Sequence, residues 1–176
     1  MRDDWKNHFT MSLSKADKLS DQGQHEEAIY WYDQALKINL KEHTSQTKNI
    51  WSTIWNDKGS SLFALKYYVD AAHCFDKAIE FNNKNDLAWH NKGYYLAYVC
   101  YSYKEALFCF QKALEHNPNN NSSLYNKAIC EENLGQKKRA INSYKTFINL
   151  NKNNPELELN VSYARRLLED LEKREL

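Results

Sequence analysis

Two pentapeptides, Trp55-Asn56-Asp57-Lys58-Gly59 and Trp89-His90-Asn91-Lys92-Gly93, share the pattern W-x-x-K-G and stand 34 residues apart. A recurrence at a fixed period of this size is typical of proteins built from stacked structural repeats. The chain of 176 residues has room for about five units of that length. The pair of motifs therefore predicts a repeat protein.

A second pattern recurs downstream of the motifs. Small and aromatic residues are spaced by four and then three positions, which aligns their side chains along one face of a helix. The four copies are Ala28, Tyr32 and Ala35; Ala71, Phe75 and Ala78; Ala106, Phe110 and Ala113; and Ala140, Tyr144 and Phe147. Each unit is thus expected to hold a first helix, a turn, and a second helix with this face.

The combined pattern resembles the tetratricopeptide repeat family, whose 34-residue unit carries W, L-G and Y in its first helix, A and F in its second, and a closing P. The matching positions, over roughly residues 9–154, are Trp55, Gly59, Leu62, Ala71, Phe75 and Ala78; Trp89, Gly93, Leu96, Ala106, Phe110, Ala113 and Pro118; and, more loosely, Leu124, Ala128, Ala140 and Tyr144, and Ala16, Leu19, Ala28, Tyr32 and Ala35. The resemblance implies an all-α, right-handed superhelical solenoid of four helix-turn-helix units with a C-terminal capping helix.

The glycines support this division. Gly59 and Gly93 fall where first helices are expected to cross a neighbour closely, and Gly23 and Gly135 fall in the turns between helices. A left-handed backbone conformation in such a turn costs glycine little. We expect one domain over 1–176, and its units span about 9–42, 52–85, 86–120 and 121–154.

The period breaks in two places. Ala28 and Ala71 are 43 residues apart, which leaves an insertion at about 43–51. The apolar spacing of Ile50, Trp51 and Ile54 favours a first helix that begins near Thr44 or Ser45, and a longer surface loop is the alternative. The second break adds one residue within 99–103, which predicts a longer or kinked turn.

The C-terminal segment, about 155–174, is predicted to be a helix. Asn154-Pro155 is a helix start signal, with Asn as the cap and Pro at the first helical position. An apolar stripe follows at helical spacing and consists of Leu157, Val161, Ala164, Leu168 and Leu171. The stripe fits a terminal cap that covers the last repeat, and it could instead pair with a second chain to form a homodimer.

Composition narrows the functional class. Lys and Arg number 24 against 23 Asp and Glu, so no basic excess favours nucleic acid or a membrane surface. No stretch is apolar enough for a membrane span or a secretory signal. The cysteines lack metal-ligand spacing, which favours free thiols in a reducing compartment and a cytoplasmic protein.

Catalytic motifs do not appear in the sequence. It has no glycine-rich phosphate loop, no HExxH and no G-x-S-x-G. Cys74 and Cys109 recur at one repeat position, which is best explained by small residues tolerated on second helices. We therefore expect no enzyme activity, no metal and no cofactor.

The family resemblance implies that first-helix side chains line a concave ligand groove. The residues it assigns to this groove are Asn56, Asp57, Ser60, Phe63, His90, Asn91, Tyr94, Tyr98, Tyr125, Asn126 and Ile129. Asn91 and Asn126 share one repeat position and can both donate to and accept from a peptide backbone. The tyrosines offer the flat, amphipathic contact area typical of binding hot spots.

The groove composition argues against one known ligand class of the family, the C-terminal carboxylate of chaperones. Three positions of the groove would need cations to bind this carboxylate. If the binding triplet starts at the second unit, these positions hold Asn56, Ser122 and Asn126; if it starts at the first unit, they hold Leu13, Leu87 and Asn91. Neither assignment supplies a cation. Acidic Asp17 and Asp57 favour a basic or neutral ligand instead.

The sequence favours a non-catalytic scaffold that binds a protein or peptide partner. It leaves two alternatives open. One is a self-associating structural protein that uses the terminal helix stripe, and the other, more remote, is an RNA-binding helical solenoid.

Overall fold

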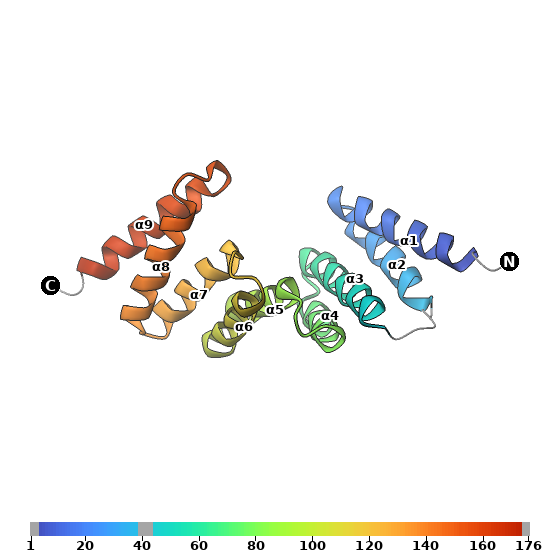
Figure 1. The fold of residues 1–176 in the computed structure, drawn as a ribbon, viewed down its shortest axis with the longest axis horizontal. Coiled ribbons are helices and arrows are strands. Elements are labelled where there is room, and N and C mark those ends of the chain that lie inside the picture. The colour runs from blue at the N-terminus through green and yellow to red at the C-terminus, as the bar shows by residue number, and fades with distance from the viewer. Residues whose placement is uncertain (1–3, 39–43, 174–176) are drawn as a thin grey trace. The chain divides into compact units, whose positions relative to one another are not determined.

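The computed structural model describes residues 4–38 and 44–173, and every regular element within these ranges is helical (Figure 1). The elements are α1 (Asp4–Asp21), α2 (His25–Lys37), α3 (Ser45–Ala64), α4 (Tyr68–Phe81), α5 (Asp86–Tyr98), α6 (Tyr103–His116), α7 (Asn121–Asn133), α8 (Lys137–Asn151), a 3₁₀ turn (Pro155–Leu157) and α9 (Glu158–Lys173). The predicted all-α class is confirmed. The chain forms two compact units, Met1–Lys92 and Gly93–Leu176.

Within each unit, helices that follow one another in the chain pack together. In the first unit α1 packs on α2, α2 on α3, and α3 on α4. In the second unit α6 packs on α7, α7 on α8, and α8 on α9. The first alanine of every triplet is fully buried at 0 % exposure: Ala28, Ala71, Ala106 and Ala140. A methyl side chain at these positions lets the backbones of neighbouring helices approach closely.

The glycines of the two W-x-x-K-G motifs allow the closest approach. A Cβ atom added to Gly59 would lie 2.7 Å from Cε1 of Phe75 and 3.1 Å from Cβ of Cys74 on α4. Gly93 repeats the arrangement against α6, where the added atom would lie 2.9 Å from Cε1 of Phe110. Separations below about 3.0 Å are repulsive, so the backbone of each motif rests directly on an aromatic ring. The expected close crossing at both glycines is confirmed.

The lysines of the two W-x-x-K-G motifs form ion pairs between helices. Lys58 of α3 forms an ion pair with Asp33 of α2, and Lys92 of α5 forms one with Asp76 of α4. Each pair joins the first helix of one repeat to the second helix of the preceding repeat. Because these lysines share one repeat position, the pairing is a periodic feature of the first unit.

The turns confirm the role assigned to the other two glycines. Gly23 and Gly135 have φ values of 76° and 69°, in the left-handed region. Lys66, between α3 and α4, also lies in the left-handed region, with a φ of 66°, although it is not a glycine. The longer turn predicted within 99–103 is confirmed. Tyr101 takes a φ of 56° in this turn, and Ser102 N donates to Leu96 O at 2.8 Å.

Helix, and not loop, occupies the described part of the predicted insertion. α3 begins at Ser45, and the Thr44 hydroxyl accepts a hydrogen bond from Thr47 N at 3.2 Å as an N-cap. The extension carries Trp51 into a cluster with Tyr32 and Ile54, where all three side chains are buried. Residue 43, the first of the insertion, lies outside the described residues.

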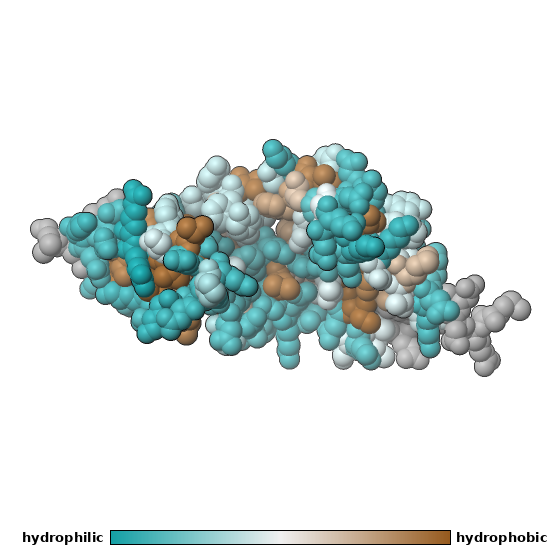
Figure 2. Space-filling view, turned by 90° about the horizontal axis from the view of Figure 1, so that it is seen from above, coloured by the Kyte–Doolittle hydropathy of each residue, from teal (hydrophilic) through white to brown (hydrophobic). Residues whose placement is uncertain are grey.

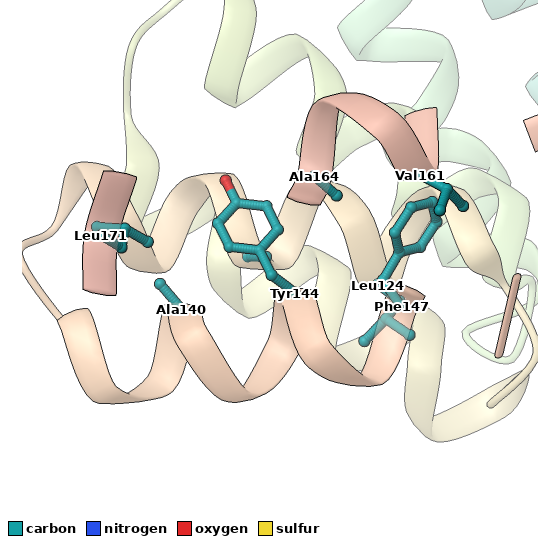
Figure 3. Close-up of a cluster of buried hydrophobic side chains, with 8 residues drawn as sticks. Leu124, Ala140, Tyr144, Phe147, Val161, Ala164 and Leu171 are labelled. Carbon is teal, nitrogen blue, oxygen red and sulfur yellow. The ribbon is translucent and has the colours of Figure 1, made fainter. Parts of the chain in front are cut away.

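The C-terminal segment covers the end of the second unit. Asn154 Oδ1 accepts from Glu156 N at 3.1 Å, as the start signal predicted, although the first turn is 3₁₀ rather than α-helical. Val161, Ala164 and Leu171 are then buried over Tyr144 and Phe147 of α8 (Figure 3). The apolar stripe of α9 is thus buried within its own chain.

Substitution Gly59→Ala tests the close approach. Alanine favours helix by about 1 kcal/mol over glycine, but overpacking a tight contact costs roughly 1–3 kcal/mol. We expect a net loss of about 1 kcal/mol in the free energy of unfolding, measured by urea denaturation. Thr53→Ala, on the exposed face of α3, is the control and should change stability by less than about 0.5 kcal/mol. A Gly59→Ala variant more stable than the parent would contradict the packing argument.

Candidate functional site

The predicted groove residues fall into two groups, one in each unit. Asn56, Asp57, Ser60, Phe63, His90 and Asn91 belong to the first unit, on α3 and α5. Tyr94, Tyr98, Tyr125, Asn126 and Ile129 belong to the second unit, on α5 and α7.

In the first unit, hydrogen bonds link the polar side chains of adjacent first helices. The Asn91 amide donates to Asn56 Oδ1 at 2.9 Å and to Ser60 Oγ at 3.3 Å. Ser60 in turn donates to the Asn56 carbonyl oxygen at 3.1 Å. Asn56 is only 4 % exposed, so its amide mainly organises its neighbours. The hydrogen-bonding capacity that the sequence suggested for a ligand is thus partly used by the scaffold.

An acidic cluster lies beside this network. Asp57 Oδ1 accepts from Asn56 Nδ2 at 3.0 Å, and Asp17 Oδ1 accepts from the Tyr32 hydroxyl at 3.0 Å. Burial, with a smaller contribution from Asp17 and Asp21, raises the pKa of Asp57 to about 6. Burial also raises the pKa of Asp17. This corner of the first unit therefore disfavours additional negative charge and would be stabilised by a nearby cation.

The two remaining residues of the first unit, His90 and Phe63, are half-buried. Burial lowers the pKa of His90 to about 4, so its imidazole is neutral at physiological pH. Phe63 packs edge-on against Tyr68 of α4, with ring centroids 5.0 Å apart. Neither residue supplies a charge to bind an ionic ligand.

The second unit holds a defined pocket of about 270 Å³. Its lining residues come from α5, α7, α8 and the C-terminal segment: Tyr94, Tyr98, Asn121, Ser122, Tyr125, Asn126, Phe147, Leu157 and Asn160. Four of the five groove residues predicted in this unit line it, and the fifth, Ile129, packs against the hydrophobic core. The structure therefore brings the predicted tyrosines and Asn126 together around one cavity.

Aromatic contacts fix the pocket wall. The Tyr94 and Tyr98 rings lie 4.4 Å apart between centroids, with their planes 33° from parallel. Tyr125 packs on Phe147 with centroids 5.1 Å apart. Tyr94 and Tyr98 are 38 % and 40 % exposed, so their outer faces remain accessible. Such rings, held in place on one side and open on the other, suit a binding surface.

Several pocket residues were not identified from the sequence. Asn121 and Phe147 lie outside the positions that the family pattern assigns to a groove, and Leu157 and Asn160 belong to the segment predicted to cap the last repeat or to pair with a second chain. The repeat pattern carries no signal for Leu157 and Asn160, because the C-terminal segment is not part of a repeat. Only the packing of α9 on α8 brings Asn160 to the pocket.

No catalytic constellation is apparent among the described residues. Lys127 Nζ lies 2.7 Å from Ser143 Oγ, which donates to Glu131 Oε2 at 2.6 Å. Ser143 and Glu131 are 4 % and 2 % exposed, so a substrate could not reach this hydroxyl. The described part of the chain contains no group of three or more potential metal ligands.

The cysteines are free thiols, and only Cys100 is exposed. Burial raises the pKa of Cys74 to about 11 and that of Cys130 to about 12, which keeps both thiols protonated and unreactive. Cys74 and Cys109 are buried beside Gly59 and Gly93, as expected for small residues on second helices.

The visible surface is mostly hydrophilic, with hydrophobic residues in separate patches (Figure 2). Within residues 4–38 and 44–173, no helix is both long and apolar enough to span a membrane.

Family models described as tetratricopeptide repeat match residues 12–42 and 109–142, one segment in each compact unit. The chain is a tetratricopeptide repeat protein. Its helix pairs, motif glycines and buried alanines agree with that assignment. No curated protein matches its sequence significantly.

Solved structures share the fold of this tetratricopeptide repeat protein at low sequence identity. The first TPR of Spaghetti (RPAP3), bound to an HSP90 peptide, aligns with a TM-score of 0.63 at 20 % identity, over 73 % of this chain and 94 % of that one. YrrB, a TPR protein with an unusual peptide-binding site, aligns with a TM-score of 0.66 at 21 % identity, over 90 % of this chain and 76 % of that one. MamA from Desulfovibrio magneticus RS-1, residues 41 to the end, aligns with a TM-score of 0.72 at 16 % identity, over 94 % of this chain and 88 % of that one. These likenesses establish the fold.

The raised pKa of Asp57 predicts a pH-dependent stability. Because the folded pKa, about 6, exceeds the ordinary value of 3.8, the folded state loses stability as the pH rises from about 4 through 6. Asp57→Asn keeps a hydrogen-bond acceptor for Asn56 and removes the charge. We expect the variant to exceed the parent at pH 7.5 by roughly 2 kcal/mol in the free energy of unfolding, and to match it near pH 4.

The measurement is urea denaturation at both pH values. Asp170→Asn, at an exposed position on α9, should leave the pH profile of the parent unchanged. Equal stability of Asp57→Asn and the parent at both pH values would show that the Asp57 carboxylate is not strained by its surroundings.

Proposed function

We propose that this protein is a non-catalytic interaction module that binds a peptide or partner domain through side chains of its first helices. The pocket of the second unit is the observation that carries the proposal. It combines accessible tyrosine faces with amide side chains, and this pairing of flat apolar area with hydrogen-bonding groups is typical of peptide-binding surfaces.

The structural neighbours support this class of function. One of them is bound to an HSP90 peptide, and another has a peptide-binding site. A chaperone tail itself is not favoured here. Two motif lysines form ion pairs within the scaffold, and the described residues that line the pocket include no cation for a carboxylate.

The proposal retains the division into four repeats, about 9–42, 52–85, 86–120 and 121–154. It also places the module in the cytoplasm, where a reducing environment keeps thiols such as exposed Cys100 free. Self-association through the α9 stripe is less favoured, because Val161, Ala164 and Leu171 are already buried against their own chain.

Affinity capture with the Tyr94→Ala/Tyr98→Ala double variant tests the proposal. Loss of two hot-spot tyrosines should reduce recovery of the partner from native cell extract by about tenfold or more, because each such side chain contributes on the order of 1–2 kcal/mol. Mass spectrometry of the captured proteins provides the measurement.

Phe108→Ala is the matched control. Phe108 is 53 % exposed on α6 and does not line the pocket, so its loss should leave recovery unchanged. Equal recovery with the tyrosine variant and the parent would refute the assignment of the pocket as the binding site, provided that thermal melting shows both proteins folded.

A further inference from the structure

We infer that the pocket of the second unit binds an uncharged, proline-bearing peptide segment, and that α9 supplies one wall of this site. The inference rests on the proposed function and narrows it. It assigns a ligand chemistry to the pocket, and it gives the C-terminal helix a binding role in addition to its capping role.

The α9 wall is built from the side of the helix that does not face the core. Leu157 and Asn160 line the pocket, whereas Val161 and Ala164 are buried in the core cluster. Burial, with smaller contributions from Tyr163 of α9 and Glu132 of α7, raises the pKa of Tyr125 to about 12. The C-terminal segment thus adds the amide of Asn160 and the aliphatic side chain of Leu157 to a site that otherwise consists of α5, α7 and α8.

The lining excludes a charged anchor. None of the described residues that line the pocket is acidic, basic or histidine. A carboxylate or an ammonium group that enters such a site loses hydration without gaining a partner of opposite charge, which costs several kcal/mol. A neutral anchor is therefore favoured.

The asparagines favour a ligand that is rich in hydrogen-bond acceptors. Asn126 Oδ1 accepts from the Tyr98 hydroxyl at 2.8 Å, and Asn121 Oδ1 accepts from Asn151 Nδ2 at 3.1 Å. Asn126 is only 7 % exposed, so the amides of half-buried Asn121 and exposed Asn160 are the more accessible ones. The N–H groups of these amides can donate hydrogen bonds to the carbonyl oxygens of a ligand.

A segment in the polyproline II conformation meets these requirements. Its carbonyl groups make no internal hydrogen bonds and point outward, and proline has no backbone N–H group that would be left unsatisfied. Proline rings pack on aromatic faces, which is the usual mode of recognition for such segments. The open faces of Tyr94 and Tyr98 and the volume of about 270 Å³ suit one or two proline rings.

The test uses the full chain and isothermal titration calorimetry with end-capped decapeptides. The probes are a decaproline, the same length of alternating leucine and serine, a glutamate-rich peptide and a lysine-rich peptide. We expect the decaproline to bind most tightly. Its Kd should change less than about twofold between roughly 0.05 M and 0.5 M NaCl, because an uncharged ligand is not screened.

Adjacent residues of α9 provide a matched pair of variants. Asn160 and Leu159 are both exposed, and only Asn160 lines the pocket. Asn160→Ala should weaken decaproline binding about fivefold to tenfold, since one hydrogen bond contributes on the order of 1 kcal/mol. Leu159→Ala should leave the Kd unchanged. Circular dichroism melting shows whether both variants keep the stability of the parent.

The inference is overturned if the decaproline does not bind, if a charged peptide or the leucine peptide binds more tightly, or if Leu159→Ala weakens binding as much as Asn160→Ala. If another peptide binds and the Tyr94→Ala/Tyr98→Ala variant loses it, the ligand chemistry inferred here is wrong and the proposed function stands. If partner capture is also insensitive to the tyrosines, both fail.

Discussion

The contact between a glycine backbone and an aromatic ring is the constraint on which both units depend. Gly59 rests on Phe75, and Gly93 rests on Phe110, at separations that leave no room for a Cβ atom. This approach sets the spacing of the first and second helices, and the buried alanines extend it along the interface. Helix pairs held this closely bury their small side chains completely, and the more exposed side chains of the first helices, such as Tyr94 and Tyr98, form the surface that could bind a ligand.

Hydrogen bonds between neighbouring first helices then decide what that surface can offer. Asn91 donates to Asn56 and Ser60, and Asn126 accepts from Tyr98. Each of these bonds occupies a donor or acceptor group of an amide that could otherwise bind a ligand. It also fixes the orientation of that amide. Differences between the two units follow from their side chains: carboxylates with a raised pKa mark the first, and an uncharged, tyrosine-rich pocket marks the second.

Much of the candidate site could be predicted from the repeat pattern, because a position within the repeat sets the face on which a side chain lies. Tyr94, Tyr98, Tyr125 and Asn126 were predicted on this basis, and all four line the pocket. The pattern could not reveal Asn160, since α9 follows no repeat register and its face toward the pocket depends on how it packs on α8. It also could not show that Asn56 is 4 % exposed, because hydrogen bonding to Asn91 and Asp57 depends on the distance between helices.

The sequence by itself determined the helical class, the W-x-x-K-G contacts and the left-handed turns at Gly23 and Gly135, because these follow from local periodicity and from residues that fit only one environment. Tertiary structure decided what the individual polar groups do. Lys58 pairs with Asp33, Asp57 acquires a pKa of about 6, and Asn160 reaches the pocket beside Tyr125. Ion pairs, burial and a shared cavity depend on segments distant in the chain, and their separations are fixed only when the helices pack.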